Sequence, residues 1–295
     1  MNRVILVIFL ILPSLSATTI NVPDDYSTIQ AGIDESSDGD TVLVAQGTYV
    51  ENLILEKEIV LTSHAINDDL SDWMGNDNIH NTVIVGNEPN NSKKGSCLQI
   101  SYGDIQPLIL GFTFQDGLGT SMIEVDCSSD LYNDTFPVRS GGAILIFEAY
   151  PTIMYNRFLN NGGGENTGGD VVASANGGAI SHYDTDDVEF DEDRNGNDHN
   201  DQGSRNIPGT MTIQNNYFEG NSSGNGENFY SHGYEGNIDV SGSVFEDIDC
   251  ETNTVNNYVL QSKEDAADYI QNNISGNCIE SDAFYVSGIF GDDSN

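Results

Sequence analysis

Short hydrophobic runs rich in β-branched residues recur along the chain, separated by glycine, asparagine and aspartate. Such runs are too short for helices and are typical of strands joined by tight turns. Long amphipathic helical periodicity is nearly absent. The pattern therefore predicts an all-β chain, with strands at 41–44, 53–55, 59–62, 82–85, 108–110 and 143–147.

The spacing T-I-x-x-N-x-F-x-x-N begins at Thr152 and again, sixty residues later, at Thr212. Weaker copies place Phe114 and Phe245 at the aromatic position, and a second motif, Gly-Gly-Ala-Ile, occupies 141–144 and 177–180. Self-similarity of this kind indicates a solenoid of stacked coils. Isoleucine and phenylalanine would fill a narrow core, and asparagine would occupy the turns and bond to the next coil. The fold predicted is a right-handed parallel β-helix.

The two ends of such a stack require caps, because only there are strand edges exposed. The segment 25–33 places Ile29 and Ile33 four residues apart after a Ser/Thr start, which predicts a short helix over the first coil. At the other end, 262–270 reads as a short helix leading into a last, irregular coil.

The first seventeen residues have the pattern of a secretory signal peptide. Arg3 precedes an apolar run that ends at Leu12, and small residues follow Pro13. The run is shorter than the roughly 20 residues that cross a bilayer. We therefore expect a secreted or cell-surface protein without a membrane span. It would consist of one β-helix domain at 18–290, with an acidic insertion at about 184–206.

Charge narrows the possible partners. The chain has 9 basic and 47 acidic residues, a formal net charge of −38. Nucleic acids and anionic membranes require clusters of lysine and arginine, so neither is an expected partner. Cations suit this surface, and we expect a monomer.

Four cysteines, Cys97, Cys127, Cys250 and Cys278, lie beyond the leader, where an oxidising environment permits disulfides. Sequence leaves three connectivities open. We favour Cys97 with Cys127 and Cys250 with Cys278, because each spacing is near one coil. Buried, unpaired cysteines are the alternative. Neither a CxxC motif nor a Cys/His cluster indicates zinc.

The acidic insertion contains half of a calcium-loop motif, in which oxygen ligands alternate and a glycine permits the sharp turn. Position twelve is Gln202 instead of glutamate, so the segment is not an EF-hand. Calcium is the one cofactor that the sequence indicates, and a solvated acidic loop is the alternative interpretation. The candidate ligands are Asp191, Asp193, Asn195, Asp198 and Asp201.

Candidate catalytic groups follow the second Gly-Gly-Ala-Ile motif, where an imidazole and carboxylates could meet at a rim of the solenoid. These are His182, Asp184, Asp186 and Asp187. Since Ile180 is expected to face the core, strand alternation allows His182 to face inward too. Exposed aromatic rings on a solenoid face could instead stack on sugars. The candidates are Tyr155, Tyr183 and Tyr217.

Residues 22–63 resemble the opening of pectinesterase-like right-handed β-helix proteins. The Gly-Gly-Ala-Ile and Asn-x-Phe-x-x-Asn coils resemble the parallel β-helix repeat of pectin-lyase-fold and bacterial surface proteins. The resemblance implies the fold. Its enzymes would be expected to carry an Arg-Pro-Trp element, an arginine base among calcium-binding aspartates, or Asn-Thr-Asp and Gly-His-Gly elements. The Arg-Pro-Trp, Asn-Thr-Asp and Gly-His-Gly elements are not found, and the only tryptophan, Trp73, lies in an Asp/Asn-rich segment. For an arginine base, the chain beyond the leader offers only Arg139, Arg157, Arg194 and Arg205.

Two functions remain open. The first is a non-enzymatic extracellular protein that binds a carbohydrate or cell-surface ligand, with calcium in its acidic loops. The second is a polysaccharide lyase or glycoside hydrolase with a divergent site near His182, which rests on analogy of fold alone. The scarcity of catalytic groups favours the first.

Overall fold

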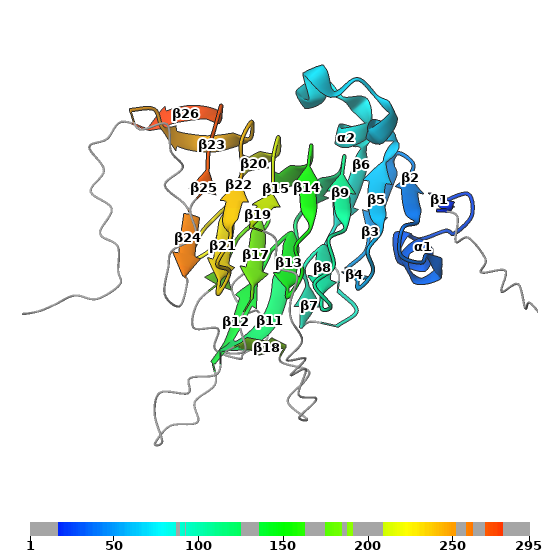
Figure 1. Cartoon of the computed structure of the whole chain (residues 1–295), viewed down its shortest axis with the longest axis horizontal. Helices are drawn as coiled ribbons and strands as arrows, with labels where there is room; N and C mark the ends of the chain where they lie inside the picture. The colour runs from blue at the N-terminus through cyan, green and yellow to red at the C-terminus, as the bar shows by residue number, and fades with distance from the viewer. Residues whose placement is uncertain are drawn as a thin grey trace, which may run out of the picture.

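The computed structural model describes residues 17–86, 89–91, 93–124, 136–162, 175–184, 188–190, 209–251, 258–261 and 269–279. Most of their strands stack in parallel, coil upon coil, and form the right-handed parallel β-helix that the repeats predict (Figure 1). We call the three sides of the stack face A, face B and face C.

Face A consists of β1 (Thr19–Val22), β2 (Thr41–Val44), β5 (Val60–Ser63), β9 (Leu108–Leu110) and β14 (Thr152–Met154). Beside β14 it continues through β19 (Thr210–Thr212), β22 (Asn237–Asp239) and β25 (Tyr269–Ile270). Face B consists of β3 (Gly47–Val50), β6 (Thr82–Val85), β10 (Thr113–Gln115), β15 (Arg157–Leu159), β20 (Tyr217–Glu219), β23 (Val244–Asp249) and β26 (Ser275–Ile279).

Face C consists of β4 (Leu53–Leu55), β8 (Leu98–Ser101), β13 (Ile144–Phe147), β17 (Ile180–Tyr183), β21 (Phe229–His232) and β24 (Tyr258–Gln261). A sheet with antiparallel pairings packs outside it. Its strands are β7 (Lys94–Gly95), β11 (Gly119–Glu124), β12 (Phe136–Ser140), β16 (Ala175–Asn176) and β18 (Val188–Phe190). The sequence patterns did not predict this outer sheet. It encloses Leu145, Phe147 and Tyr183, which point away from the main core.

A column of phenylalanines runs through the core behind face B. Phe158 pairs in register with Phe218, so the offset of sixty is one coil lengthened by an insertion. The rings stack with centroids 5.5 Å apart between Phe114 and Phe158, 5.0 Å between Phe158 and Phe218, and 4.9 Å between Phe218 and Phe245. All four side chains are buried. Burial of an aromatic side chain stabilises the fold by about 2 to 3 kcal/mol, so this column is a major part of the core.

Buried asparagines connect successive coils at the turns. Asn156 accepts from the Phe112 N–H at 3.0 Å and donates to the Ile109 carbonyl at 3.0 Å. In the next coil Asn216 accepts from the Asn156 N–H at 2.9 Å and donates to the Ile153 carbonyl at 2.9 Å. The amide supplies both a donor and an acceptor, which no apolar or purely acidic side chain does.

A second ladder repeats this arrangement one turn along. Asn161 accepts from the Gly117 N–H at 2.9 Å, and Asn221 accepts from the Asn161 N–H at 3.1 Å. The two asparagines donate to the carbonyls of Phe114 and Phe158 at 3.1 and 3.0 Å. The asparagines of the repeat motif therefore pair the backbone groups that the turns leave without strand partners.

From β9 onward, one residue per coil adopts positive φ where face A turns into face B. In chain order these residues are Gly111 (84°), Tyr155 (56°), Asn215 (53°), Gly242 (72°) and Asn273 (55°). Glycine and asparagine tolerate this left-handed backbone best. Tyr155 is the exception in the column.

Helix α1 (Ile29–Glu35) covers the first coil, as predicted, although it starts after an N-cap at Thr28 and not at residue 25. The carboxylate of Glu51 accepts from the N–H groups of Ile29 and Gln30, each at 3.0 Å. At the other end, the Lys57 ammonium donates to three carbonyls between Ile33 and Ser36 at 2.7 to 2.9 Å. The first coil thus satisfies both ends of its own cap.

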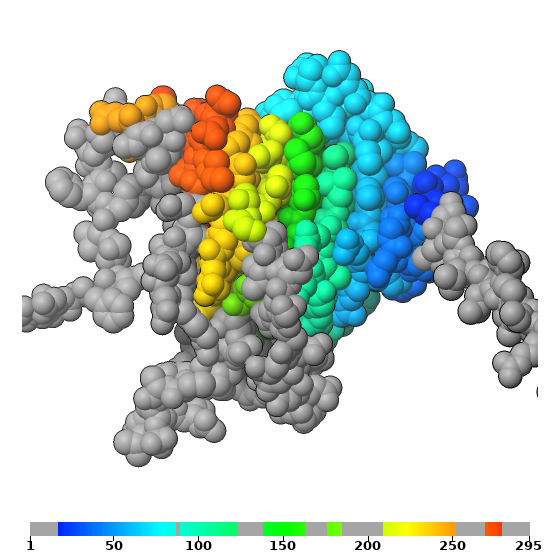
Figure 2. Space-filling model, viewed as in Figure 1, coloured from blue at the N-terminus to red at the C-terminus, as the bar shows by residue number. Residues whose placement is uncertain are grey.

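Residues 64–81 leave the solenoid between β5 and β6 and fold into three short helices: η1 (His64–Asn67), η2 (Leu70–Gly75) and α2 (Asp77–Asn81). We call this segment the arm. Figure 2 shows it projecting from the stack. Ser63, Asp69 and Asn76 cap the three helices. Sequence inspection identified this stretch only as an Asp/Asn-rich segment.

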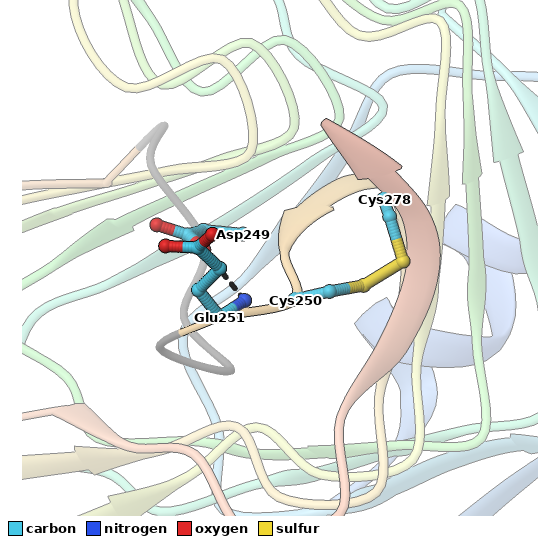
Figure 3. Close-up of a disulfide and its surroundings, with 4 residues drawn as sticks. All are labelled: Asp249, Cys250, Glu251 and Cys278. Carbon is cyan, nitrogen blue, oxygen red and sulfur yellow. Dashed lines mark hydrogen bonds between the residues drawn. A yellow bond between two sulfur atoms is a disulfide. The ribbon is translucent and has the colours of Figure 1, made fainter. Parts of the chain in front are cut away.

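The C-terminal coil ends in a disulfide between Cys250 and Cys278, whose Cα atoms are 5.3 Å apart (Figure 3). It joins the turn after β23 to β26, which confirms this predicted pair.

The predicted pairing of Cys97 with Cys127 is wrong, because Cys97 is a free thiol, fully buried against the Gln115 carbonyl. Burial raises the pKa of this thiol to about 12. Cys127 lies outside the described residues.

The C-terminal segment differs partly from expectation. Residues 269–270 form a strand, β25, and with β26 complete a last coil, whereas 262–268 lie outside the described residues. The leader, residues 1–16, also lies outside them. Among the described helices, none is long and apolar enough to cross a membrane.

Replacing Asn156 with alanine should cost about 2 to 4 kcal/mol, because it leaves a buried N–H and at least one buried carbonyl without partners. Equilibrium urea denaturation measures this. Asn237→Ala is the control, since Asn237 is an exposed strand residue, and it should change stability by at most about 0.5 kcal/mol. Equal effects of the two variants would contradict the assigned role of the ladder.

Candidate functional site

The predicted catalytic histidine does not lie at a rim of the solenoid. His182 lies on β17 with its side chain inside the solenoid and no exposed surface. It occupies the column that holds Ile146 in the coil before and Ser231 in the coil after. Asp184 follows the strand at a half-buried position, and Asp186 and Asp187 lie outside the described residues. His182 is therefore not placed to contact an external substrate.

Inside the core, the His182 ring packs between two tyrosines. Its centroid lies 5.9 Å from the ring of Tyr150 and 5.1 Å from that of Tyr234. Nδ1 lies 3.2 Å from the Ser231 hydroxyl. Nε2 is buried and has no hydrogen-bond partner among the described residues. Burial lowers the pKa of His182 to about 3, so the ring is neutral in the native protein at ordinary pH.

The three candidate sugar-binding tyrosines are in different environments. Tyr183 is fully buried beneath the outer sheet, where its hydroxyl lies 2.7 Å from that of Ser140 and 3.0 Å from the amide nitrogen of Asn176. It is a core residue and not a ligand contact. Tyr155 and Tyr217 are only partly buried and belong to one apolar cluster outside the main core. The structure therefore brings two of the three together.

That cluster forms where the arm meets the outer side of the stack. We call the polar and aromatic side chains at this junction the Arg157 surface: Trp73, His80, Tyr155, Arg157, Tyr217 and Glu219. Arg157 and Tyr217 flank the inward-pointing Phe158 and Phe218, so strand alternation turns both outward on face B. Parallel pairing in register places them side by side despite the sixty residues between them.

The guanidinium of Arg157 lies over the Tyr217 ring, 5.5 Å from its centroid, in a cation–π contact. Its Nη1 donates to Nδ1 of His80 at 3.2 Å. On the other side of the imidazole, Nε2 lies 2.7 Å from the Met74 carbonyl and must donate to it. These two contacts fix the tautomer of His80 with its proton on Nε2.

No carboxylate of the described residues forms an ion pair with Arg157. Partial burial lowers the pKa of the guanidinium, which remains charged, while Tyr217 and Glu219 oppose the shift. The Tyr217 hydroxyl donates to Oε2 of Glu219 at 2.9 Å, and burial together with this carboxylate raises its pKa. The Arg157 surface therefore carries a guanidinium cation, aromatic rings and the carboxylate of Glu219.

Sequence reasoning missed His80, Arg157 and Trp73 as members of one site. Arg157 was recognisable as one of few arginines in an acidic chain, and the repeat already placed it one coil from Tyr217. The positions of Trp73 and His80 depend on how the arm folds back. No repeat or periodicity encodes that packing.

The predicted calcium ligands cannot be placed, because residues 191–208 lie outside the described residues. Within the part of the chain that the structure describes, no three His, Cys, Asp or Glu side chains converge as a metal site would require. Calcium binding by the acidic insertion stays a prediction.

Comparisons with known proteins are sparse. No protein-family model matches the chain, and no curated protein does. Similar solved structures include a pectin methylesterase in complex with a hexasaccharide, at 12% identity and TM-score 0.31 over 90% of this chain and 91% of that chain. Another is pectin methylesterase PemA from Erwinia chrysanthemi, at 12% identity and TM-score 0.27 over the same shares. Likenesses this low carry no argument about activity or ligand.

The buried imidazole makes stability depend on pH. An unfolded histidine binds a proton near pH 6.5, whereas His182 in the folded chain does so only near pH 3. Above pH 6.5 the imidazole is neutral in both states, and the fold keeps its full stability. As the pH falls from 6.5 toward 3, only the unfolded chain binds the proton, so the free energy of unfolding decreases. Between pH 7 and pH 5 the loss should be about 2 kcal/mol.

Urea denaturation of His182→Leu tests this, because leucine matches the aliphatic residues Ile100 and Ile146 that precede His182 in the same column. The difference in unfolding free energy between pH 7 and pH 5 should shrink by about 2 kcal/mol in this variant. His64→Gln, at an exposed position, should keep the wild-type difference. An unchanged pH dependence in His182→Leu would show that other groups cause it.

Proposed function

We propose that this chain is a secreted, non-catalytic β-helix protein that binds extracellular carbohydrate through the Arg157 surface. The supporting observation is the Arg157 guanidinium itself. It is half-buried, lies over the Tyr217 ring, is oriented by His80, and has no ion pair with a carboxylate of the described chain. A cation held in this way has donors available for a ligand.

The groups at this surface suit a sugar. A guanidinium has five N–H donors in a rigid fork, and among the described contacts only Nη1 of Arg157 donates to another side chain. Hydroxyl-rich ligands accept several such bonds at once. Partly exposed aromatic rings cover the apolar faces of sugars, and Tyr155 and Tyr217 supply them.

Binding is favoured over catalysis by the position of the candidate groups. The imidazole predicted to act as a base is in the core, and the enzyme motifs of similar folds are not found in the sequence. The imidazole at the Arg157 surface, His80, has its two nitrogens occupied by Arg157 and Met74. The polar groups there are arranged to hold one another in place.

Affinity electrophoresis and calorimetry against a panel of neutral and acidic polysaccharides test the proposal. Arg157→Gln and Tyr217→Leu should each weaken binding about tenfold or more, equivalent to about 1.4 kcal/mol. Asn237→Ala, on face A, is the matched surface control and should bind like the wild type. Full binding by both site variants would place the ligand elsewhere. Release of new reducing ends, unsaturated products or methanol would support the enzyme alternative.

The acidic insertion supports calcium binding as a second component of this function, since Asp191, Asp193 and Asn195 precede a glycine at calcium-loop spacing. Millimolar calcium should raise the thermal midpoint relative to chelator, because a ligand bound only by the folded state stabilises it. The double variant Asp191→Ala/Asp193→Ala should abolish the rise. No calcium effect on the wild type would leave the insertion as a solvated loop.

A further inference from the structure

Tyr155 occupies a backbone position at which every other described coil with this turn has glycine or asparagine. Its φ is 56°, in the left-handed region that a tyrosine rarely adopts. The equivalent residue of the next coil is Asn215, with φ 53°. Since the same turn is made elsewhere by residues that suit it better, the backbone alone does not require tyrosine here. An unfavourable residue that persists in a regular repeat indicates a role for its side chain.

The side chain contacts the arm. The Tyr155 ring meets Trp73 edge to face, with centroids 6.0 Å apart and planes at 70°. Trp73 is only 9% exposed, so this contact and the surrounding cluster bury most of the indole. Trp73 is followed directly by Met74, whose carbonyl accepts from His80, and His80 in turn accepts from Arg157. A continuous series of contacts therefore connects the Tyr155 ring to the guanidinium.

The base of the arm has its own attachments. Thr113 on β10 donates to the Ile79 carbonyl at 2.9 Å, and Gln46 donates to the side chain of Asn78 at 3.0 Å. These bonds hold helix α2 independently of Trp73. Loss of the Tyr155 ring should therefore displace the part of the arm that carries Trp73 and Met74, and leave the solenoid intact.

We propose that Tyr155 is a positioning residue: it seats Trp73 and, through the Met74 carbonyl and His80, orients the Arg157 guanidinium for its ligand. The proposal rests on the proposed function of the Arg157 surface. It explains why tyrosine is present in a column of glycine and asparagine. It also assigns the arm a role as the element that shapes the binding surface.

Trp73 is the only tryptophan of the chain, so its fluorescence directly reports the packing of the indole against Tyr155. Tyr155→Asn should shift the emission to longer wavelength and increase quenching by acrylamide, while the thermal midpoint moves by only a few degrees. Tyr155→Phe keeps the ring and should preserve the wild-type emission. Asn215→Gly, at the equivalent turn of the next coil, is the matched control and should also leave it unchanged.

The orientation of Arg157 has a readout that needs no ligand. Nitrogen-15 NMR of the imidazole should find the proton of His80 on Nε2 in the wild type and in Tyr155→Phe, and a mixture of tautomers in Tyr155→Asn. Polysaccharide affinity should fall about fivefold or more in Tyr155→Asn and stay unchanged in Tyr155→Phe.

Unchanged Trp73 emission and an unchanged His80 tautomer in Tyr155→Asn would overturn the proposal. If the wild type binds no polysaccharide, the proposed function fails, and the fluorescence and tautomer measurements still decide whether Tyr155 positions Arg157. If both spectroscopic signals change in Tyr155→Asn but this variant binds polysaccharide as tightly as the wild type, then Tyr155 does hold Trp73 in place, but this packing does not serve ligand binding. That result would also contradict the proposal.

Discussion

The structure depends on the requirement that backbone groups in its turns find partners in the next coil. Strand residues meet this requirement through the parallel sheets, but turn residues have no strand beside them. The buried asparagines meet it there, because one amide both accepts from a backbone N–H of one coil and donates to a carbonyl of that coil. Each ladder allows only one alignment of neighbouring coils. The register of the three faces, and of the phenylalanine column behind face B, follows from that alignment.

Fixed register also makes function possible at positions far apart in the sequence. Arg157 and Tyr217 are neighbours because the two strands that carry them pair residue for residue. The insertion between them lengthens one coil and does not disturb this pairing. The arm uses the same property between β5 and β6, where a long excursion leaves and returns without changing the pairing of β6 with β3. A rigid stack with adjustable connections is well suited to carrying a binding surface.

What the sequence predicted correctly was local or repeated. The predicted strands lie within one residue of β2, β4, β5, β6, β9 and β13, because short β-branched runs between turn residues are a local signal. The helix over the first coil and the disulfide of the last coil followed from spacing. The outer sheet and the arm did not, because they depend on how irregular segments fold back on the stack. For Cys97, spacing favoured a disulfide, and the buried, unpaired alternative is the one that the structure shows. Alternation along β17 allowed an inward His182, but only packing shows that two tyrosines enclose it.

The second asparagine ladder also bears on how the protein ages chemically. Asn161 precedes Gly162, and an Asn-Gly pair deamidates readily in flexible chains, when the glycine nitrogen attacks the side-chain carbonyl. In the stack, the Gly162 N–H donates to the Gly117 carbonyl at 3.0 Å and the Asn161 amide is held at both ends, so the attacking geometry is denied. In the unfolded chain the same pair is not protected from deamidation. An aspartate formed there could no longer donate to the Phe114 carbonyl, so each period of unfolding would irreversibly remove this hydrogen bond from a fraction of the molecules.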